Sequence, residues 1–487
     1  MIDSKRVKVL FIIGVVTFLG TTLDSFAQNL FFQRVFDQSL AQTSYVVGNK
    51  QTGEAIVVDP KRDIDTYLKI IKENNLKITR VTETHIHADY LSGTRELAYA
   101  TGAELILSGE TDPDWKYEIP HTPIKDGQQI IMGTILIEAM HTPGHTPESL
   151  TFLITDLSVS KYQQKALTGD FIFVGDVGRP DLLEKVAGQV GSQNIGAKQL
   201  YESIKRFSKL SDDLEIWPGH GAGSFCGKSL SDVSQSTLGQ EKLTNKAFHF
   251  KDNQQGFVKY ILDGQPEPPS YFATMKKLNR VSRPLLLEVP IHPELNKEEF
   301  INARNHGVTI VDARKIEKVA TGHIPGSLHI EGNTFFSTFM GWLLDYQNQF
   351  IVITEKEDKE ELTRKLMRIG LDNMYGFISN IDALEIPLNK SDLLSKDDFK
   401  TRFNDSKAQI IDVRSKNEFD SGHIVTAENI MFKDLSTNIN HISKDKQVIV
   451  HCKSGSRAAM AYSILKKHGF TNVKAYLGDL EGLVTPN

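Results

Sequence analysis

The sequence predicts an α/β protein built from one large domain followed by two smaller, mutually related α/β domains. From about residue 29 to residue 264, short apolar strands alternate with amphipathic helices. A proline-rich break at 265–269 then interrupts this pattern. After the break, two segments about 100 residues apart repeat each other, a period typical of whole domains rather than of solenoid repeats. A length of 487 residues agrees with three domains.

The composition is that of an ordinary globular protein, with 40% hydrophobic and 24% charged residues and a net charge of −5. This balance excludes an electrostatic nucleic-acid binder, which needs a basic stripe. The chain has only two cysteines, Cys226 and Cys452. Two thiols form neither a disulfide framework nor a four-thiolate zinc site, so each cysteine is considered singly.

Residues 1–27 have the pattern of a secretory signal peptide. Positive charges at positions 5, 6 and 8 precede an apolar run over 9–23, and a small-x-small site follows at Ser25–Ala27. We therefore expect an exported protein, periplasmic or secreted, that has no membrane attachment after cleavage. The alternative is that the segment stays uncleaved as a membrane anchor.

The first domain, predicted over 28–264, carries histidines and carboxylates in four loops that follow predicted strands. Apolar stretches at 55–60, 78–84 and 166–173 predict three of its strands, and an apolar face with helical spacing over 197–207 predicts a helix. The four loops contribute the following side chains: His85, His87 and Asp89; His145; Asp170; and His220. Since all four loops lie beside glycine-rich turns at strand ends, we predict that they converge on a metal ion.

The order and local sequence of these loops resemble the metallo-β-lactamase superfamily, which implies an αββα sandwich with the metal at its strand ends. The family motif HxHxDH is changed at its last position, where Tyr90 stands. In two-metal members that histidine helps to hold the second metal, so the resemblance implies a single metal here. The resulting ligand set of His85, His145 and Asp170 suits one Fe(II) with open positions, and Zn stays an alternative.

His87, Asp89, Tyr90 and His220 are then expected to surround the ligands and orient them or a bound water. The alternative is that His87 is itself a ligand. Two further stretches, 175–181 and 220–227, resemble the persulfide dioxygenase branch, particularly its fusions to rhodanese domains. That resemblance implies that Arg179 steers an anionic thiol such as glutathione, with an ordinary surface ion pair as the alternative. Cys226 is predicted either to relay sulfur or to fill a small buried space.

The last domain, predicted over 387–487, has a cysteine between a strand and a helix. An apolar strand at 447–450 leads into the loop 451–457, and a helical stretch follows at 458–468. Backbone N–H groups at such a helix start stabilise an anion, so Cys452 is predicted to be a nucleophile, with Lys453 and Arg457 adding positive charge. The loop resembles that of rhodaneses, and the six residues from Cys452 to Arg457, as in that family, favour sulfur transfer over phosphate chemistry.

The middle domain, predicted over 265–386, is a copy of the last one. Asp312, Arg314 and the Gly-His-Ile at 322–324 correspond to Asp412, Arg414 and 422–424. At the position of the cysteine loop, however, the strand 350–353 leads into 354–358, which has three acidic residues and no cysteine. Acidic groups repel an anionic persulfide. We expect this copy to be catalytically inactive.

Together these features predict a bifunctional persulfide dioxygenase and thiosulfate-type sulfurtransferase. Its expected partners are O2, a glutathione-like thiol or its persulfide, and sulfite or thiosulfate. Whether the chain forms a homo-oligomer is left open by the sequence. One rival is a thioester hydrolase of the glyoxalase II type with two metals. The other is a non-catalytic sulfur carrier whose metal is structural.

Overall fold

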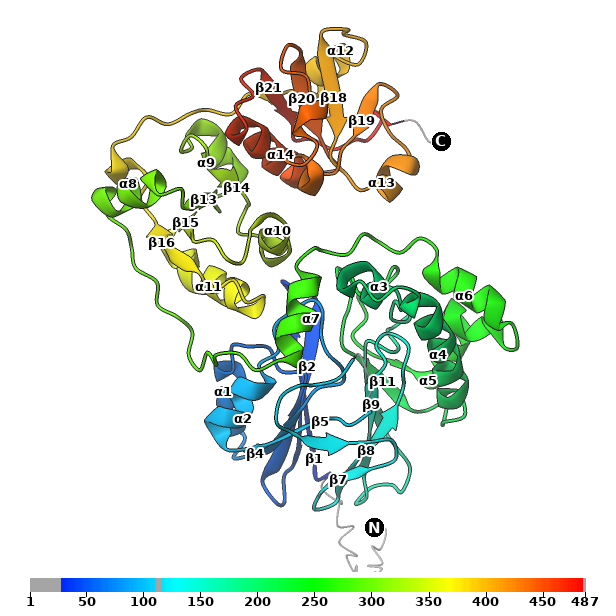
Figure 1. Ribbon diagram of the computed structural model, residues 1–487. Helices are drawn as coiled ribbons and strands as arrows, with labels where there is room; N and C mark the ends of the chain where they lie inside the picture. Colours follow the sequence, from blue (N-terminus) through cyan, green and yellow to red (C-terminus); the bar gives the residue numbers. More distant parts are fainter. Residues whose placement is uncertain (1–27, 111–114, 485–487) are drawn as a thin grey trace, which may run out of the picture.

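A two-layered sheet sandwich forms the lower part of the molecule, and two smaller α/β domains lie above it (Figure 1). This computed structural model describes residues 28–110 and 115–484. The predicted fold class, an αββα sandwich followed by two smaller α/β domains, is confirmed. The expected signal peptide, 1–27, lies outside the described residues. Within the described ranges, no helix is long and apolar enough to span a bilayer.

Each layer of the sandwich is a six-stranded sheet whose strand order follows the chain. The first sheet contains β1 (Leu30–Asp37), β2 (Gln42–Asn49), β3 (Glu54–Val58), β4 (Lys77–Thr82), β5 (Glu104–Ser108) and β6 (Thr122–Ile124). The second contains β7 (Gln129–Met132), β8 (Ile135–His141), β9 (Leu150–Asp156), β10 (Lys165–Gly169), β11 (Glu215–Pro218) and β12 (Ser236–Thr237). The pairs β3–β4 and β10–β11 are parallel, so their carboxyl ends share one edge.

Apolar residues on both faces of the strands explain the four layers. In β3, Ile56 and Val58 pack between the sheets, whereas Ala55 and Val57 face the helices outside. The helices α1 (Asp65–Glu73) and α2 (Thr94–Thr101) cover the first sheet. The second sheet is covered by α4 (Ser192–Phe207) and α6 (Gln254–Leu262), with α3 (Leu182–Ala187) and α5 (Leu238–Thr244) beside them.

The two smaller domains each have a parallel sheet with helices on both faces. The middle sheet has the order β14-β13-β15-β16 and the last sheet β17-β21-β20-β18-β19. The middle domain contains α8 (Lys297–Asn305), β13 (Thr309–Asp312), α9 (Ile316–Thr321), β14 (Leu328–His329), α10 (Phe336–Leu343), β15 (Phe350–Ile353), α11 (Lys359–Arg368) and β16 (Met374–Ile378). The last contains β17 (Leu393–Leu394), α12 (Lys396–Thr401), β18 (Ala408–Asp412), α13 (Lys416–Asp420), β19 (Ala427–Asn429), β20 (Gln447–His451), α14 (Ser456–Lys467) and β21 (Val473–Tyr476).

The repeated sequence pattern makes the same contacts in both copies. Nη2 of Arg314 donates to the carbonyl of Gly322 at 2.8 Å, and Nη2 of Arg414 donates to that of Gly422 at 2.8 Å. Nε of each arginine also donates to the aspartate two positions earlier, at 2.9 Å in both domains. The arginine thus ties the strand end to the following glycine turn in each copy.

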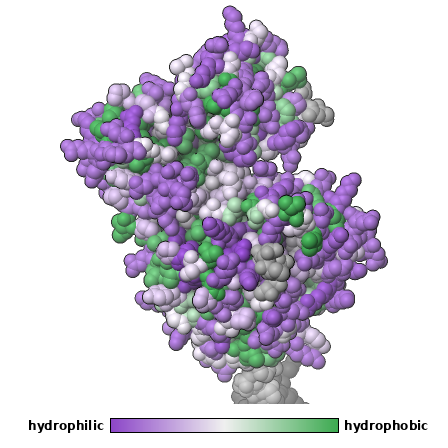
Figure 2. Space-filling view, in the orientation of Figure 1, coloured by the Kyte–Doolittle hydropathy of each residue, from purple (hydrophilic) through white to green (hydrophobic). Residues whose placement is uncertain are grey.

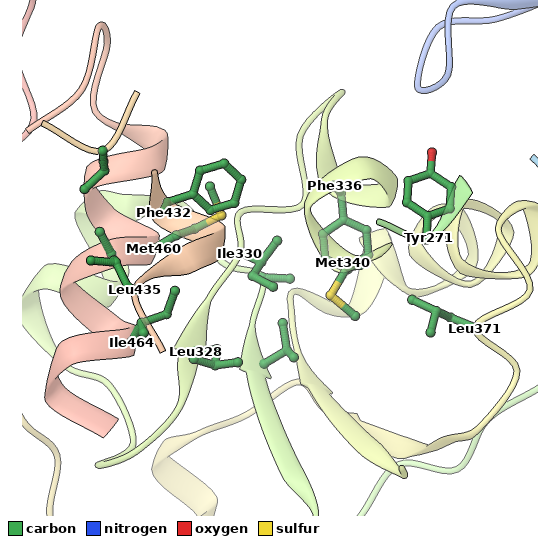
Figure 3. Packing of buried hydrophobic residues seen from close by; sticks show 14 of the residues in the cluster. Tyr271, Leu328, Ile330, Phe336, Met340, Leu371, Phe432, Leu435, Met460 and Ile464 are labelled. Carbon is green, nitrogen blue, oxygen red and sulfur yellow. The ribbon is translucent and has the colours of Figure 1, made fainter. Parts of the chain in front are cut away.

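One apolar core runs through all three domains. Met460 and Ile464 of α14 lie against Leu328 and Ile330 of the middle domain, as Figure 3 shows. On the other side of the same cluster, Phe336 and Met340 face Tyr271, next to the short helix α7 (Phe272–Arg280) (Figure 3). The face of the molecule seen in Figure 2 is mostly hydrophilic. Pale and apolar residues lie along the border between the sandwich and the two smaller domains. The domains are therefore packed on one another, while their predicted boundaries stay predictions.

Buried ion pairs join the middle domain to the sandwich. Arg368 of α11 donates through Nη2 to Asp63 at 2.5 Å and contacts Asp37 at 3.0 Å, and all three side chains are at most 6% exposed. Next to it, Nη1 of Arg62 donates to Asp372 at 2.7 Å. Buried pairs of this kind are costly to break singly, because the remaining charge loses its partner.

We expect Arg368→Met to destabilise the docking of the middle domain by about 3 kcal/mol, since the buried Asp37 loses its paired guanidinium and Asp63 loses one of three cationic partners. The control is Arg206→Met, which removes an exposed pair with Asp126 and should cost less than about 1 kcal/mol. Urea unfolding of both variants gives the comparison. Equal midpoints for the two variants would contradict a role of Arg368 in docking.

Candidate metal centre and thiol loop

Three side chains from three strand ends converge between the two sheets. His85 follows β4, His145 lies in the loop between β8 and β9, and Asp170 follows β10. Oδ2 of Asp170 lies 3.7 Å from Nε2 of His85 and 3.6 Å from Nε2 of His145. All three residues are buried and offer ligand atoms within 4.8 Å of one another. The structure thus brings together the three residues that were predicted as metal ligands.

The hydrogen bonds of these residues fit a metal ion. The three converging atoms are buried and have no hydrogen-bond partner, a costly state that a cation relieves. Nδ1 of His145 donates to the carbonyl of Arg179 at 2.9 Å. In the neutral ring, Nε2 then carries no proton. Nδ1 of His85 bonds Thr84 Oγ1 at 3.0 Å, and that hydroxyl donates to Asp59. Both imidazoles therefore present a lone pair to the centre.

The charges agree with this assignment. Burial lowers the pKa of His145 to about 4 and that of His85 well below its usual value. Burial alone would raise the pKa of Asp170, but the charge and hydrogen bond of His220 hold it well below the ordinary value. Two neutral imidazoles and one carboxylate form a set with one negative charge, which suits a divalent cation with open coordination positions.

A second group lies beside the first and consists of Asp89, His220 and Cys226. His220 donates from Nε2 to Asp89 at 2.7 Å and from Nδ1 to Asp170 at 2.6 Å. Although burial lowers the pKa of His220, the charges of the two carboxylates raise it well above the usual value. Burial, followed by the same two charges, raises the pKa of the Cys226 thiol well above its ordinary value. His220 therefore links the two carboxylates, and the predicted sulfur relay through Cys226 stays a prediction.

His87 and Tyr90 are not part of this group, and both contact Asp59. Nε2 of His87 bonds Asp59 Oδ1 at 3.0 Å, and the Tyr90 hydroxyl donates to the carbonyl of Asp59 at 3.1 Å. The two rings lie against each other, with centroids 4.5 Å apart. Asp59, at the end of β3, therefore organises this side of the site. The sequence interpretation missed it, although a carboxylate that follows a buried strand next to β4 was an available signal.

The helix α7 and its N-cap residue, Tyr271, hold the backbone of the histidine loop, residues 85–92. Asn279 donates to the carbonyls of His87 and Tyr90 at 2.9 and 2.8 Å, and it accepts from the N–H of Ser92 at 2.9 Å. The Tyr271 hydroxyl donates to the carbonyl of Asp89 at 2.9 Å. All of these groups are buried. The position of the loop thus depends on residues almost 200 positions later in the chain.

Lys276, on the same helix, is a second residue that the sequence interpretation missed. It is 1% exposed, its Nζ lies 3.5 Å from the carbonyl of Ile86, and it lies over the ring of Trp115. Burial lowers its pKa, while Glu148, Cys226 and Asp170 act in the opposite direction. This side chain brings a cationic group close to the metal ligands.

Arg179 has a different environment from the one expected of a group that steers substrate. It is fully buried, and its guanidinium pairs with Asp181 through two hydrogen bonds of 2.7 Å. Nη1 donates to the carbonyls of Phe225 and Pro266 at 3.2 and 2.7 Å. In this conformation Arg179 holds the backbone of the loop that carries Cys226. A contact between Arg179 and a thiol substrate stays a prediction. Nearby, Gly178 leaves no room for a side chain, because a Cβ there would lie 1.8 Å from the carbonyl of Asp170.

Cys452 lies between β20 and α14, as the sequence predicts. The N–H of Gly455 donates to its sulfur at 3.1 Å. Gly455 has φ +102, and a Cβ there would lie 2.5 Å from the carbonyl of Leu477, so the loop needs glycine at this position. Lys453 is exposed, whereas Arg457 forms a two-pronged pair with Glu418 at 2.6 and 2.8 Å. Glu418 thus balances much of the charge that Arg457 brings to the loop.

The corresponding loop of the middle domain differs in shape and charge. β15 ends at Ile353, and residues Lys356–Asp358 form a single 3-10 turn before α11. Glu355 pairs with Lys318 at 2.7 Å. No thiol is available in this domain, since the chain has cysteines only at 226 and 452.

We expect His85→Ala to reduce bound metal to near zero while the fold is retained, because one of three protein ligands is lost. Elemental analysis together with circular dichroism measures both properties. The matched control is His249→Ala, at an exposed histidine of the same domain. Full metal content in the His85 variant would exclude this centre, and global unfolding would favour a purely structural metal.

A second expected outcome concerns Asn279→Ala. The change leaves two carbonyls and one N–H of the histidine loop without partners, at about 1–3 kcal/mol, and should weaken metal binding about tenfold or more. Competition with a chelator measures the affinity. Lys277→Ala, at the exposed neighbour on the same helix, should leave it unchanged. Equal affinities in the two variants would show that α7 does not position the ligands.

Comparison with known proteins finds two families of domains along the chain. The metallo-beta-lactamase superfamily model matches residues 39–220, and the rhodanese-like domain model matches 296–379 and 395–485. A solved metallo-beta-lactamase from Staphylococcus aureus subsp. aureus COL is 39% identical, with a TM-score of 0.65, over 72% of this chain and 98% of that chain.

Curated relatives include a persulfide dioxygenase and a hydroxyacylglutathione hydrolase. The human mitochondrial persulfide dioxygenase ETHE1 is 27% identical over 218 residues, which are 44% of this chain and 76% of that protein. The hydroxyacylglutathione hydrolase of Francisella tularensis subsp. novicida is 29% identical over 185 residues, which are 38% of this chain and 64% of that protein. The chain belongs to the metallo-β-lactamase superfamily, and it joins a domain homologous to persulfide dioxygenases to two rhodanese-like domains.

Proposed function

We propose that this protein oxidises low-molecular-weight persulfides to sulfite with O2 and transfers sulfane sulfur through Cys452. The observation that carries the proposal is the convergence of two neutral imidazoles and one carboxylate, all with unpartnered atoms, in a chain that also has a thiol at a helix start. The homology to persulfide dioxygenases and to rhodaneses supports sulfur chemistry at both places.

At the first site, His85, His145 and Asp170 would hold one Fe(II). Bound there, the ion would supply the activation of O2 and the positions for a persulfide. The protein keeps both imidazoles in the correct tautomer through Thr84 and the carbonyl of Arg179. His220 holds Oδ1 of Asp170, so that Oδ2 is directed to the centre. Overall, persulfide, O2 and water give thiol, sulfite and two protons.

At the second site, the Cys452 thiolate attacks the outer sulfur of a persulfide and releases the parent thiolate. The sulfur then sits on Cys452 as a persulfide, and sulfite takes it up to form thiosulfate. The N–H of Gly455 and the start of α14 stabilise the negative charge on the sulfur. The middle domain has no thiol for this reaction and is proposed to be catalytically inactive.

The thiol that carries the persulfide is proposed to be small and anionic, like glutathione. The protein is further proposed to act outside the cytoplasm, on the basis of the signal pattern in residues 1–27. Amino-terminal sequencing of the protein recovered from the producing cells tests this, with a new terminus near residue 28 as the expected result. An intact terminus would contradict cleavage.

A thioester hydrolase is the second candidate. Asp89 and His220 lie beside the first site together with Cys226, so that ligand atoms for another ion are at hand, and one relative is named a hydroxyacylglutathione hydrolase. This candidate requires two metals and activity without O2. Metal counting combined with thioester hydrolysis under anaerobic conditions separates the two functions.

We expect the two activities to separate by mutation. Cys452→Ser should keep O2 uptake on glutathione persulfide and lose sulfur transfer to sulfite, since serine cannot carry the persulfide. His85→Ala should do the opposite. An oxygen electrode and thiosulfate analysis measure both reactions in each variant. If wild-type protein that contains iron consumes no O2 with this substrate, the dioxygenase proposal is wrong.

A further inference from the structure

Each of the two proposed sites has a cavity in its neighbourhood. One of about 320 Å³ is bordered by Asp89 and His220 beside the metal ligands. The other, of about 470 Å³, is bordered by Ser454, Ser456 and Arg457 of the cysteine loop. The first cavity is bordered by residues of the sandwich and of the middle domain, whereas the second is bordered by residues of all three domains.

The two cavities have one wall in common. Phe225, Phe335 and Thr338 line both of them. Phe225 directly precedes Cys226, whereas Phe335 caps α10 and Thr338 lies in its first turn. These three side chains form the partition at the border that the two cavities share. Phe335 is 47% exposed, and exposed side chains change rotamer within nanoseconds, so the partition is able to open.

Aromatic residues from all three domains frame this partition. The ring of Trp342 in α10 lies 5.3 Å from that of Phe225 in the sandwich and 5.3 Å from that of Phe432 in the last domain. Close aromatic contacts of this kind add stability beyond simple burial. The middle domain thus holds the two cavities next to each other, although it has no thiol of its own.

We propose that the two cavities form one internal route, along which sulfite made beside the metal ligands reaches the Cys452 persulfide before it mixes with bulk solvent. The inference rests on the proposed function. In the transfer, the S–S bond of the Cys452 persulfide breaks and a new S–S bond forms to sulfite. The products are the Cys452 thiolate and thiosulfate, with no change in total charge. The middle domain supplies the partition through α10.

The test follows sulfur isotopes in the full-length, iron-loaded protein. Glutathione persulfide and O2 are supplied together with ³⁴S-labelled sulfite in the bulk, and mass spectrometry measures the label in the sulfonate sulfur of the first thiosulfate formed. Confinement raises an effective concentration to the order of millimolar. With ~0.1 mM bulk sulfite, the label should therefore be about tenfold below the bulk fraction. A label equal to the bulk fraction would overturn the route.

Variants of Phe335 sharpen the test. Phe335 is half exposed, so its ring also lies between the cavities and the solvent. Phe335→Ala should therefore open the route to bulk sulfite, and the label in thiosulfate should rise severalfold toward the bulk fraction. Phe335→Leu keeps an apolar side chain and should retain the low label. Tyr162→Ala, at an exposed aromatic residue of the sandwich that borders neither cavity, is the control. An unchanged label in Phe335→Ala would contradict the assigned partition.

The outcomes also distinguish this inference from the proposed function. If the protein takes up no O2 with persulfide, the proposed function fails, and no label ratio is defined. If O2 uptake and thiosulfate formation are both present and the label equals that of the bulk sulfite, the function stands and the route fails. The label ratio belongs to each product molecule, so slower turnover in a variant does not alter it.

Discussion

The hydrogen bonds from α7 to the histidine loop are the constraint on which the metal centre depends. The loop 85–92 is buried, so its carbonyls need partners inside the protein. Asn279 and Tyr271 provide them for three carbonyls, and Lys276 approaches a fourth. The helix α7 follows the proline-rich break at 265–269. The carbonyls of the loop 85–92 therefore find these partners only when the chain beyond the break packs against the loop.

The same helix connects the centre to the middle domain. Gly341 of α10 lies so close to the Tyr271 ring that a Cβ there would be 2.4 Å from it. On the opposite side, the N–H of Leu91 donates to the carbonyl of Arg368 at 2.7 Å, and Arg368 is held by buried carboxylates of the sandwich. The thiol-less domain therefore acts as a structural support. It contacts the end of the ligand loop and carries the partition between the two cavities.

A strand end followed by a glycine turn is the signal from which the sequence predicts side chains that lie close together in the structure. His85, His145 and Asp170 follow this rule, and so does Cys452 in front of α14. The partners that orient them could not be predicted, because Asn279 lies 192 and 189 positions from the carbonyls that it binds. Arg179 shows the same limit. The sequence motif predicts an arginine at this position. The complete burial of Arg179 and its hydrogen bond to the carbonyl of Pro266 arise from the packing of the linker, which the motif does not predict.

The nature of the centre is tested most directly by X-ray absorption at the iron edge of the protein as isolated. For the proposed centre of two histidines and one carboxylate, we expect one iron per chain, only nitrogen and oxygen atoms bound to it, and no second metal nearby. A metal–metal scattering path, or a sulfur ligand from Cys226, would contradict a single open iron centre. Either result would instead favour a two-metal site that includes Asp89 and His220.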